Sequence, residues 1–182
     1  LVAWGKEKNL KTAQNEAGNV LIIKPASPGL ESAPRVVLQG HMDMVCVKDK
    51  GITHDFTCDP IEMEEKDGWL TAKGTTLGAD DGIGVAMALA LLEEEMDLPE
   101  IRVVVTTDEE EGMLGVMTLD HSWLDADMLI NIDSEEEGYV TCGCAGGATG
   151  NFIIPLKREK VENQAGLHLT LSGMHGGHSG QN

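Results

Sequence analysis

Three apolar runs rich in β-branched residues constrain the fold of this chain most strongly. They cover residues 34–40 (PRVVLQG), 101–107 (IRVVVTT) and 127–133 (DMLINID). Short runs without alternating polar residues are typical of strands buried on both faces, as in parallel sheets. A fourth segment, residues 81–95 (DGIGVAMALALLEEE), is apolar around nearly its whole circumference until the closing acids. This pattern predicts a helix that is buried on more than one side.

The order of these segments predicts the fold class. The predicted helix lies between the first two apolar runs, and the third run follows, as in α/β folds. We therefore expect an α/β protein with a mixed, mostly parallel sheet flanked by helices. Residues 18–25 (GNVLIIKP) predict a further strand, and residues 61–74 predict a hairpin that turns at 66–68.

The composition excludes several classes of protein. The 182 residues include 13 Lys and Arg against 31 Asp and Glu, a formal net charge of −18. Such an acidic surface repels nucleic acid and anionic lipid, and no basic cluster offsets it. No apolar run reaches the roughly 18 residues of a transmembrane helix. We expect a globular cytoplasmic protein with no nucleic-acid partner and no membrane partner.

The four cysteines favour a reducing compartment. Cys46, Cys58, Cys142 and Cys144 form no CxxC pair, and the last two are too close in sequence for an ordinary intrachain disulfide. A zinc–thiolate site is the alternative interpretation, although the paired spacing typical of such sites is absent.

Ionisable side chains stand where the apolar segments end. They are His41 and Asp43 after the first run, Asp108, Glu109 and Glu110 after the second, Asp133 after the third, and Asp80 and Asp81 at the start of the predicted helix. In open α/β sheets the carboxyl ends of the strands form the ligand-binding edge. If the strands are parallel neighbours, these side chains meet in one crevice.

Each of these signals also has a purely structural explanation. A His at a strand end is commonly a hydrogen-bonded structural residue, an Asp before a helix is commonly an N-cap, and a run of Glu is commonly a solvated turn. These explanations are independent of one another, whereas a bound cation accounts for all the signals together. A cation would also stabilise the four consecutive carboxylates at residues 108–111.

The residue types indicate borderline or hard divalent metal ions. One imidazole with several carboxylates suits zinc, manganese or cobalt. So many carboxylates are balanced better by two ions about 3.5–4 Å apart that share a bridging carboxylate. His41 and Asp43 lie on the same face of a strand, so Asp43 can hold the imidazole N–H. Glu109 and Glu110 point opposite ways on an extended chain, and a loop bend would let one bind metal while the other faces the substrate water.

Four motifs carry a resemblance to a known family. GHMDMV, GTTLGADDGIG, TTDEEEG and NIDSEEEG, in that order, resemble the clan of co-catalytic metallopeptidases that contains dinuclear zinc aminopeptidases and carboxypeptidases. Within that clan, KGTTLGAD, DSEEEG and CAGG resemble the bacterial aminoacyl-histidine dipeptidases, also called Xaa-His or cytosolic non-specific dipeptidases. The resemblance spans residues 1–182. It implies a zinc-peptidase-like catalytic domain with two Zn²⁺ ions, for which Mn²⁺ or Co²⁺ can substitute.

The resemblance also implies metal ligands among the matching residues. His41 would bind one ion and Asp133 the other, Asp80 would bridge both ions, and Glu110 would be a further metal ligand. The family has one more ligand, a His far toward the C-terminus, and this sequence ends before it. We therefore expect the chain to be a fragment that is inactive alone.

Three residues are expected to take part in catalysis on the same grounds. Glu109 would be the general base, and Asp43 would orient the imidazole of His41. His178, in GGHSG, matches a His that helps to stabilise the oxyanion in relatives, and His175 is the competing choice.

The resemblance and the sequence pattern predict two domains. Residues 1–160 would form an incomplete catalytic metal-binding domain. Residues 161–182 would begin a separate α+β lid domain, with a first strand near 165–172 (AGLHLTLS), where apolar residues alternate. The expected partners are a small peptide substrate and a second copy of the chain, joined through the lid domain as a homodimer.

The expected function is metal-dependent hydrolysis of dipeptides, of the Xaa-His type such as carnosine. Another peptidase or deacylase of the same clan would share the same ligands, so that substrate profiling alone separates it. A non-catalytic acidic protein that binds Ca²⁺ or Mg²⁺ is a rival from another class, but it has no use for His41. A structural or interaction module with merely solvated acids is a third alternative.

Overall fold

The computed structural model describes residues 1–134, 138–144, 146, 148, 150–160, 162 and 165–173. The chain divides into a compact unit of residues 1–137 and a second unit of residues 138–182. All helices and strands found in the described residues belong to the first unit.

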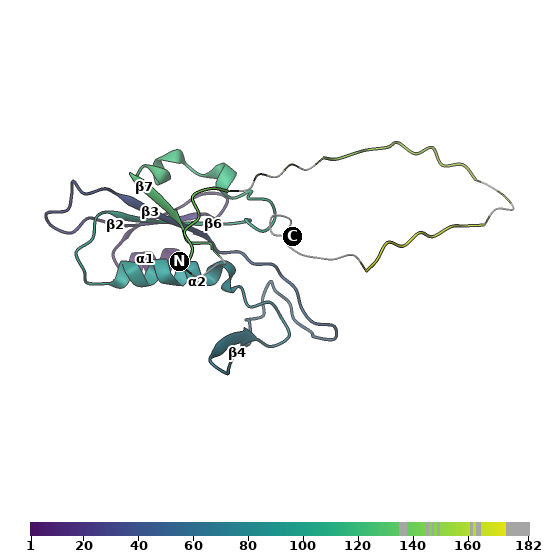
Figure 1. Ribbon diagram of the computed structural model, residues 1–182, viewed down its shortest axis with the longest axis horizontal. Coiled ribbons are helices and arrows are strands. Elements are labelled where there is room, and N and C mark those ends of the chain that lie inside the picture. Colours follow the sequence, from purple (N-terminus) through teal and green to yellow (C-terminus); the bar gives the residue numbers. More distant parts are fainter. Residues whose placement is uncertain are drawn as a thin grey trace. The chain divides into compact units, whose positions relative to one another are not determined.

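A five-stranded mixed sheet forms the centre of the first unit (Figure 1). In spatial order its strands are β1 (Lys11–Gln14), β2 (Val20–Lys24), β6 (Ile101–Thr106), β3 (Val36–His41) and β7 (Met128–Asn131). The strands β6, β3 and β7 are parallel to one another, whereas β2 runs antiparallel to both β1 and β6. The prediction of a mixed, mostly parallel sheet is confirmed, because only β2 runs against the other four strands.

Helices cover both faces of this sheet, as expected. The helices α1 (Val2–Glu7) and α2 (Ala79–Glu93) lie on one side, and the short helical turns η1 (Val116–Thr118) and η2 (His121–Leu124), in green, lie on the other (Figure 1). Alternate side chains of each central strand therefore point to opposite faces of the sheet and pack in two different hydrophobic cores. On β6, for example, Val103 packs in the core beneath α2, and Val104 packs in the core beneath Trp123.

The helix α2 departs from its prediction in one respect. It begins and ends two residues earlier than expected, and it packs against the sheet through Gly84, Ala88 and Leu92. Its opposite side is not buried, since Ile83 and Met87 are each 62% exposed. The expectation of a helix buried on more than one side is therefore wrong for this chain, because the side of α2 that carries Ile83 and Met87 stays exposed among the described residues.

The predicted hairpin is confirmed outside the main sheet. The strands β4 (Met63–Lys66) and β5 (Trp69–Ala72) pair antiparallel. The turn between them uses Asp67 and Gly68, both with positive φ, as two-residue hairpin turns require.

The second unit contains neither helix nor strand among its described residues. The strand predicted near 165–172 is wrong, because residues 165–173 are exposed and irregular. Its alternating side chains Leu167, Leu169 and Leu171 are exposed, and the described residues supply neither a partner strand nor a core to cover them. The start of a lid domain over residues 161–182 stays a prediction. No helix in the described part of the chain is long and apolar enough to cross a membrane.

Candidate metal centre

The carboxyl ends of three neighbouring parallel strands bring the predicted side chains to one edge of the sheet. In the register of β3 and β6, His41 pairs with Thr106, so the loop that carries Glu109 and Glu110 begins beside the imidazole. On its other side β3 pairs with β7, and Asp133 follows β7 by two residues. The strand order β6-β3-β7 thus places His41 between the two groups of carboxylates.

His41 is buried, with 1% of its surface exposed, and both of its ring nitrogens face oxygen atoms. Its Nε2 lies 2.9 Å from Oδ1 of Asp80 and 3.8 Å from Oδ1 of Asp133. Its Nδ1 lies 2.9 Å from the backbone oxygen of Asp43 and 3.5 Å from Oδ1 of the same residue. A neutral imidazole that donates from Nδ1 to Asp43 keeps the lone pair of Nε2 available to a metal ion.

The environment of His41 favours its protonated form in the absence of a cation. Burial lowers the pKa of the imidazole, but the hydrogen bond to Asp80 and the charges of Asp133, Asp43 and Asp80 outweigh it, so that the pKa is raised. A proton on Nε2 occupies the position in which a metal ion would bind. Protons and metal ions therefore compete for this nitrogen.

The two adjacent aspartates at the start of α2 have different surroundings. The carboxyl group of Asp80 is half exposed and faces His41. Asp81 is 3% exposed and accepts a hydrogen bond from the backbone N–H of His41 at 3.2 Å. Burial raises the pKa of Asp81 to about 6. A Cβ atom on Gly40 or Gly84 would collide with this carboxyl group, so two glycines make the space that holds it.

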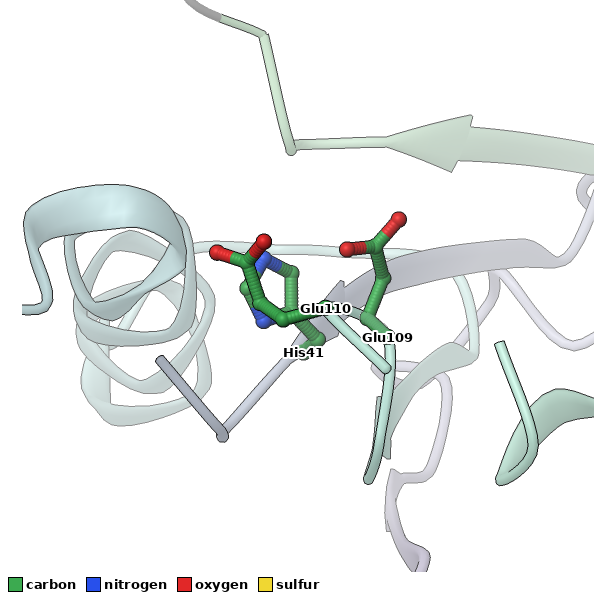
Figure 2. Close-up of side chains that lie close together, drawn as sticks. All are labelled: His41, Glu109 and Glu110. Carbon is green, nitrogen blue, oxygen red and sulfur yellow. The ribbon is translucent and has the colours of Figure 1, made fainter. Parts of the chain in front are cut away.

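The loop after β6 turns both glutamates toward the imidazole. Figure 2 shows the carboxyl group of Glu110 beside the ring of His41 and that of Glu109 pointing to the same side. Asp108 has φ +55°, which bends the backbone directly before Glu109. The backbone N–H of Glu110 also donates a hydrogen bond of 3.2 Å to Oδ2 of Asp43. Burial, followed by the charges of Asp80 and Glu109, raises the pKa of Glu110.

The described residues contain two groups of possible metal ligands, and His41 belongs to both. His41, Asp80 and Asp133 offer donor atoms that all lie within 4.8 Å of one another, and so do His41, Glu109 and Glu110. Each group combines one imidazole nitrogen with two carboxylate oxygens, a donor set that suits zinc, manganese or cobalt.

Three further observations fit a cation at this edge. The Oδ1 atom of Asp43 is buried without a hydrogen-bond partner. Burial raises the pKa of Asp133 to about 6, and the negative charge of Asp81 adds to this rise. No group of potential ligands found in the described residues includes a cysteine, and all four thiols are free and exposed. The donor chemistry therefore favours the carboxylate–imidazole site over the zinc–thiolate alternative.

The structure thus brings together six of the seven predicted site residues. They are His41, Asp43, Asp80, Glu109, Glu110 and Asp133. His178 and its competitor His175 lie outside the described residues. The resemblance assigns no role to Asp81, although the structure buries its carboxyl group beside the backbone of His41. Gly84, three residues after Asp81 in DDGIG, and Gly40, directly before His41, are the sequence signals of its tight packing.

Comparison with known proteins identifies relatives that share most of this chain. It is 48% identical over 184 residues to the cytosol non-specific dipeptidase of Escherichia coli (strain K12), an alignment that covers 99% of the chain and 38% of that relative. It is 34% identical over 123 residues to a probable succinyl-diaminopimelate desuccinylase of Staphylococcus aureus (strain MRSA252), with 66% of the chain and 28% of the relative covered.

Two solved structures resemble the fold. The aminoacylhistidine dipeptidase of Vibrio alginolyticus matches with a TM-score of 0.71 and 49% identity, over 75% of this chain and 28% of that one. A tripeptidase of Staphylococcus aureus subsp. aureus Mu50 matches with a TM-score of 0.60 and 26% identity, over 72% and 36%. The chain thus spans well under half the length of these relatives.

The family assignment agrees with both the sequence motifs and the geometry. The sequence profile of peptidase family M20/M25/M40 matches residues 37–179, a range that includes every predicted site residue. By this match and by its 48% identity to the E. coli dipeptidase, the chain belongs to peptidase family M20/M25/M40.

Proposed function

We propose that the protein containing this chain hydrolyses dipeptides with the help of two divalent metal ions. We expect these ions to be Zn²⁺, for which Mn²⁺ or Co²⁺ can substitute. The observation that carries the proposal is the convergence of His41, Asp80 and Asp133 within 4.8 Å at the carboxyl edge of the sheet. The names of the E. coli and Vibrio relatives support a dipeptide as the substrate.

Within this proposal the ligands divide between two ions. The resemblance implies different ions for His41 and Asp133, but the grouping of their donor atoms with Asp80 supports a shared ion. In this proposal His41 and Asp133 would hold one ion, Glu110 would hold the other, and Asp80 would bridge them. The distances from Nε2 of His41 to Asp80 and Asp133 support the first set. Asp43 would orient the imidazole, in keeping with the Nδ1 contact to its backbone oxygen.

The chemistry assigned to the chain is proton transfer. The bound ions would lower the pKa of a water molecule and polarise the scissile carbonyl group. Glu109 would take the proton of the attacking water and return it to the leaving amine, acting first as base and then as acid. Its carboxyl group lies beside the ligand groups, which supports this role. His178 would donate a hydrogen bond to the developing oxyanion.

The finer features of the function are proposals of the same kind. We expect the substrate to be an Xaa-His dipeptide such as carnosine, and the location to be cytoplasmic, in line with the names of the relatives. We also expect residues 1–160 to belong to the catalytic domain and residues 161–182 to begin a lid domain through which two copies dimerise.

A matched pair of loop variants tests the proposal in the full-length protein. Glu109→Gln should retain bound zinc and lose turnover by about 10²–10⁴-fold, the usual contribution of a general base. Glu111→Gln, which removes the same charge two residues away, should retain turnover. Elemental analysis and a carnosine hydrolysis assay measure the two quantities. Near-normal turnover of Glu109→Gln would contradict the assignment of the base.

A deacylase of the same family is the second candidate function. The similarity to the probable desuccinylase of S. aureus over 66% of the chain is the observation in its favour. The full-length protein should be assayed on carnosine and on an N-succinyl amino acid. Faster hydrolysis of the succinyl compound would favour the deacylase.

A further inference from the structure

The loop that carries Glu109 and Glu110 is closed at its base by a buried asparagine that belongs to none of the site motifs. Asn19 lies directly before β2 and has 0% of its surface exposed. Residues 108–114 form a loop between Thr107, which directly follows β6, and Gly115, which directly precedes η1. A backbone hydrogen bond of 3.1 Å from the N–H of Gly115 to the oxygen of Thr107 joins the two ends of this loop.

The side chain of Asn19 bridges the same two ends. Its Oδ1 accepts hydrogen bonds from the backbone N–H of Thr107 at 3.0 Å and from the hydroxyl group of Thr107 at 3.4 Å. Its Nδ2 donates to the backbone oxygen of Gly115 at 2.9 Å and to Oγ1 of Thr118 at 3.1 Å. Both amide atoms are thus satisfied inside the protein, and each holds one end of the loop.

The side chain of Asn19 and the two ends of the loop pack closely around Gly115. A Cβ atom on Gly115 would collide with the backbone oxygen of Thr107 and would lie 2.8 Å from Oδ1 of Asn19. Thr118 completes the contact, because its hydroxyl group donates to the backbone oxygen of Gly115 at 2.8 Å.

The loop needs such support because its backbone is locally unfavourable. Asp108 and Met113 have φ values of +55° and +61°, a region that non-glycine residues rarely adopt. Conformations of this kind persist where the surrounding structure enforces them. The loop is held near its tip by Asp43, which accepts from the N–H of Glu110, and at its base by Asn19.

We infer that Asn19 is a positioning residue for the proposed reaction: by closing the base of the loop, it sets where the carboxyl groups of Glu109 and Glu110 stand relative to His41. The inference rests on the proposed function, in which Glu109 is the base and Glu110 a ligand. Asn19 acts only through the backbone of the loop.

Asn19→Asp is the sharpest test, made in the full-length protein. The variant keeps the size of the side chain and its acceptor toward Thr107, but a carboxylate cannot donate to Gly115. We expect kcat on carnosine to fall about 10–100-fold with KM within about 3-fold, because misplacing a reacting group by about 1 Å has an effect of this order. The dissociation constant of zinc, measured by chelator competition, should rise about 10-fold, since Glu110 moves with the loop.

Ser27→Ala is the matched control. The Ser27 hydroxyl group accepts a hydrogen bond of 3.0 Å from the backbone N–H of Leu98. Like the contacts of Asn19, this is a hydrogen bond from a side chain to the backbone of a segment next to β6, but it lies before β6 begins, at the opposite edge of the sheet. This variant should leave kcat and zinc affinity within about 2-fold of the wild type. Ser27 lies far from the proposed site, and substitutions at distant positions act independently of one another. An equal loss of kcat in Ser27→Ala and Asn19→Asp would overturn the inference, since general destabilisation would then explain both.

A double-mutant cycle with Glu109→Gln separates positioning from a general effect. If Asn19 acts through Glu109, Asn19→Asp should reduce the residual kcat of Glu109→Gln by less than about 3-fold, because residues that act as a unit are not additive. A full 10–100-fold further loss would overturn the inference. If Asn19→Asp does not fold, Thr118→Val replaces it, and an unchanged kcat and zinc affinity in that variant would overturn the inference.

The same variants distinguish failure of the proposed base, Glu109, from failure of the inference about Asn19. An active Glu109→Gln would overturn the proposed base and this inference with it. An inactive Glu109→Gln beside a folded Asn19→Asp with normal kcat and normal zinc affinity would overturn the inference alone.

Discussion

The Nε2 atom of His41 lies 2.9 Å from Oδ1 of Asp80, although the two residues are 39 positions apart in the sequence. The contact forms because β3 ends, and α2 begins, at the same edge of the sheet. Both groups are ligands in the proposed site, so the contact marks the place where a cation would enter between them.

Removal of the proposed bridging carboxylate should abolish metal binding. Asp80→Ala deletes a donor atom that would serve both ions, so the loss of zinc affinity should exceed the roughly 10–100-fold that loss of an outer-sphere partner causes. Elemental analysis of the full-length protein after dialysis measures the zinc content. Asp49→Ala, which removes an exposed acid outside both ligand groups, is the control and should retain zinc. A wild-type zinc content in Asp80→Ala would contradict the bridging role.

Neutralising Asp43 should weaken zinc binding without deleting a ligand. The backbone oxygen of Asp43 still accepts from Nδ1 of His41 in Asp43→Asn, but the negative charge beside the ring is lost. Loss of such a partner makes the imidazole a poorer ligand, and we expect zinc affinity to fall about 10–100-fold. Chelator competition measures the change, and unaltered affinity would show that the backbone oxygen alone is sufficient.

Two glycines of α2 should respond in opposite ways to alanine. In Gly84→Ala the new Cβ atom would collide with the carboxyl group of Asp81 and lie 2.7 Å from the backbone oxygen of Ile132, so we expect a loss of about 1–3 kcal/mol in the free energy of unfolding. In Gly82→Ala the Cβ atom meets nothing within 4 Å, and the change should stabilise the protein by up to about 1 kcal/mol. Urea unfolding of the metal-free full-length protein measures both. Stabilisation by Gly84→Ala would contradict the tight packing around Asp81.

The metal-free protein should lose stability as the pH rises. Asp81 and Asp133 have pKa values of about 6 in the folded state, against about 4 for Asp in an unfolded chain. Between these values the folded state binds more protons, so the free energy of unfolding falls as the pH rises from about 4 to about 6. The raised pKa of His41 continues the trend, because its stabilising contribution is complete below its unfolded pKa and is lost as the pH passes its folded pKa.

Zinc affinity should follow the opposite trend. The ligands must be deprotonated to bind metal, so affinity should rise with pH over the range in which the metal-free protein becomes less stable. Urea unfolding at constant ionic strength and chelator competition, both at several pH values, measure the two trends. Asp133→Asn should flatten the stability trend, because it removes one of the carboxyl groups with a raised pKa. An equally steep trend in this variant would contradict the role of Asp133.

Several features of the site could be predicted because they depend on local patterns. The β-branched runs identify the strands that end at His41 and before Asp108, since short apolar runs rich in β-branched residues are typical of strands buried in a parallel sheet. The convergence of the carboxylates follows from the parallel direction of those strands. Asn19 could not be found this way, because a lone asparagine before a strand has no distinctive pattern and its partners lie 88 and 96 positions away.

The sequence by itself determined which segments become strands, which residues stand at their carboxyl ends and to which family the chain belongs, because these depend on neighbouring residues along the chain. Only the tertiary structure decided that β6 inserts between β2 and β3, that Asp81 is buried while Asp80 faces His41, and that both Glu109 and Glu110 turn to the same side. These outcomes depend on the pairing of distant strands and on the space that two glycines leave, and local sequence encodes neither of them.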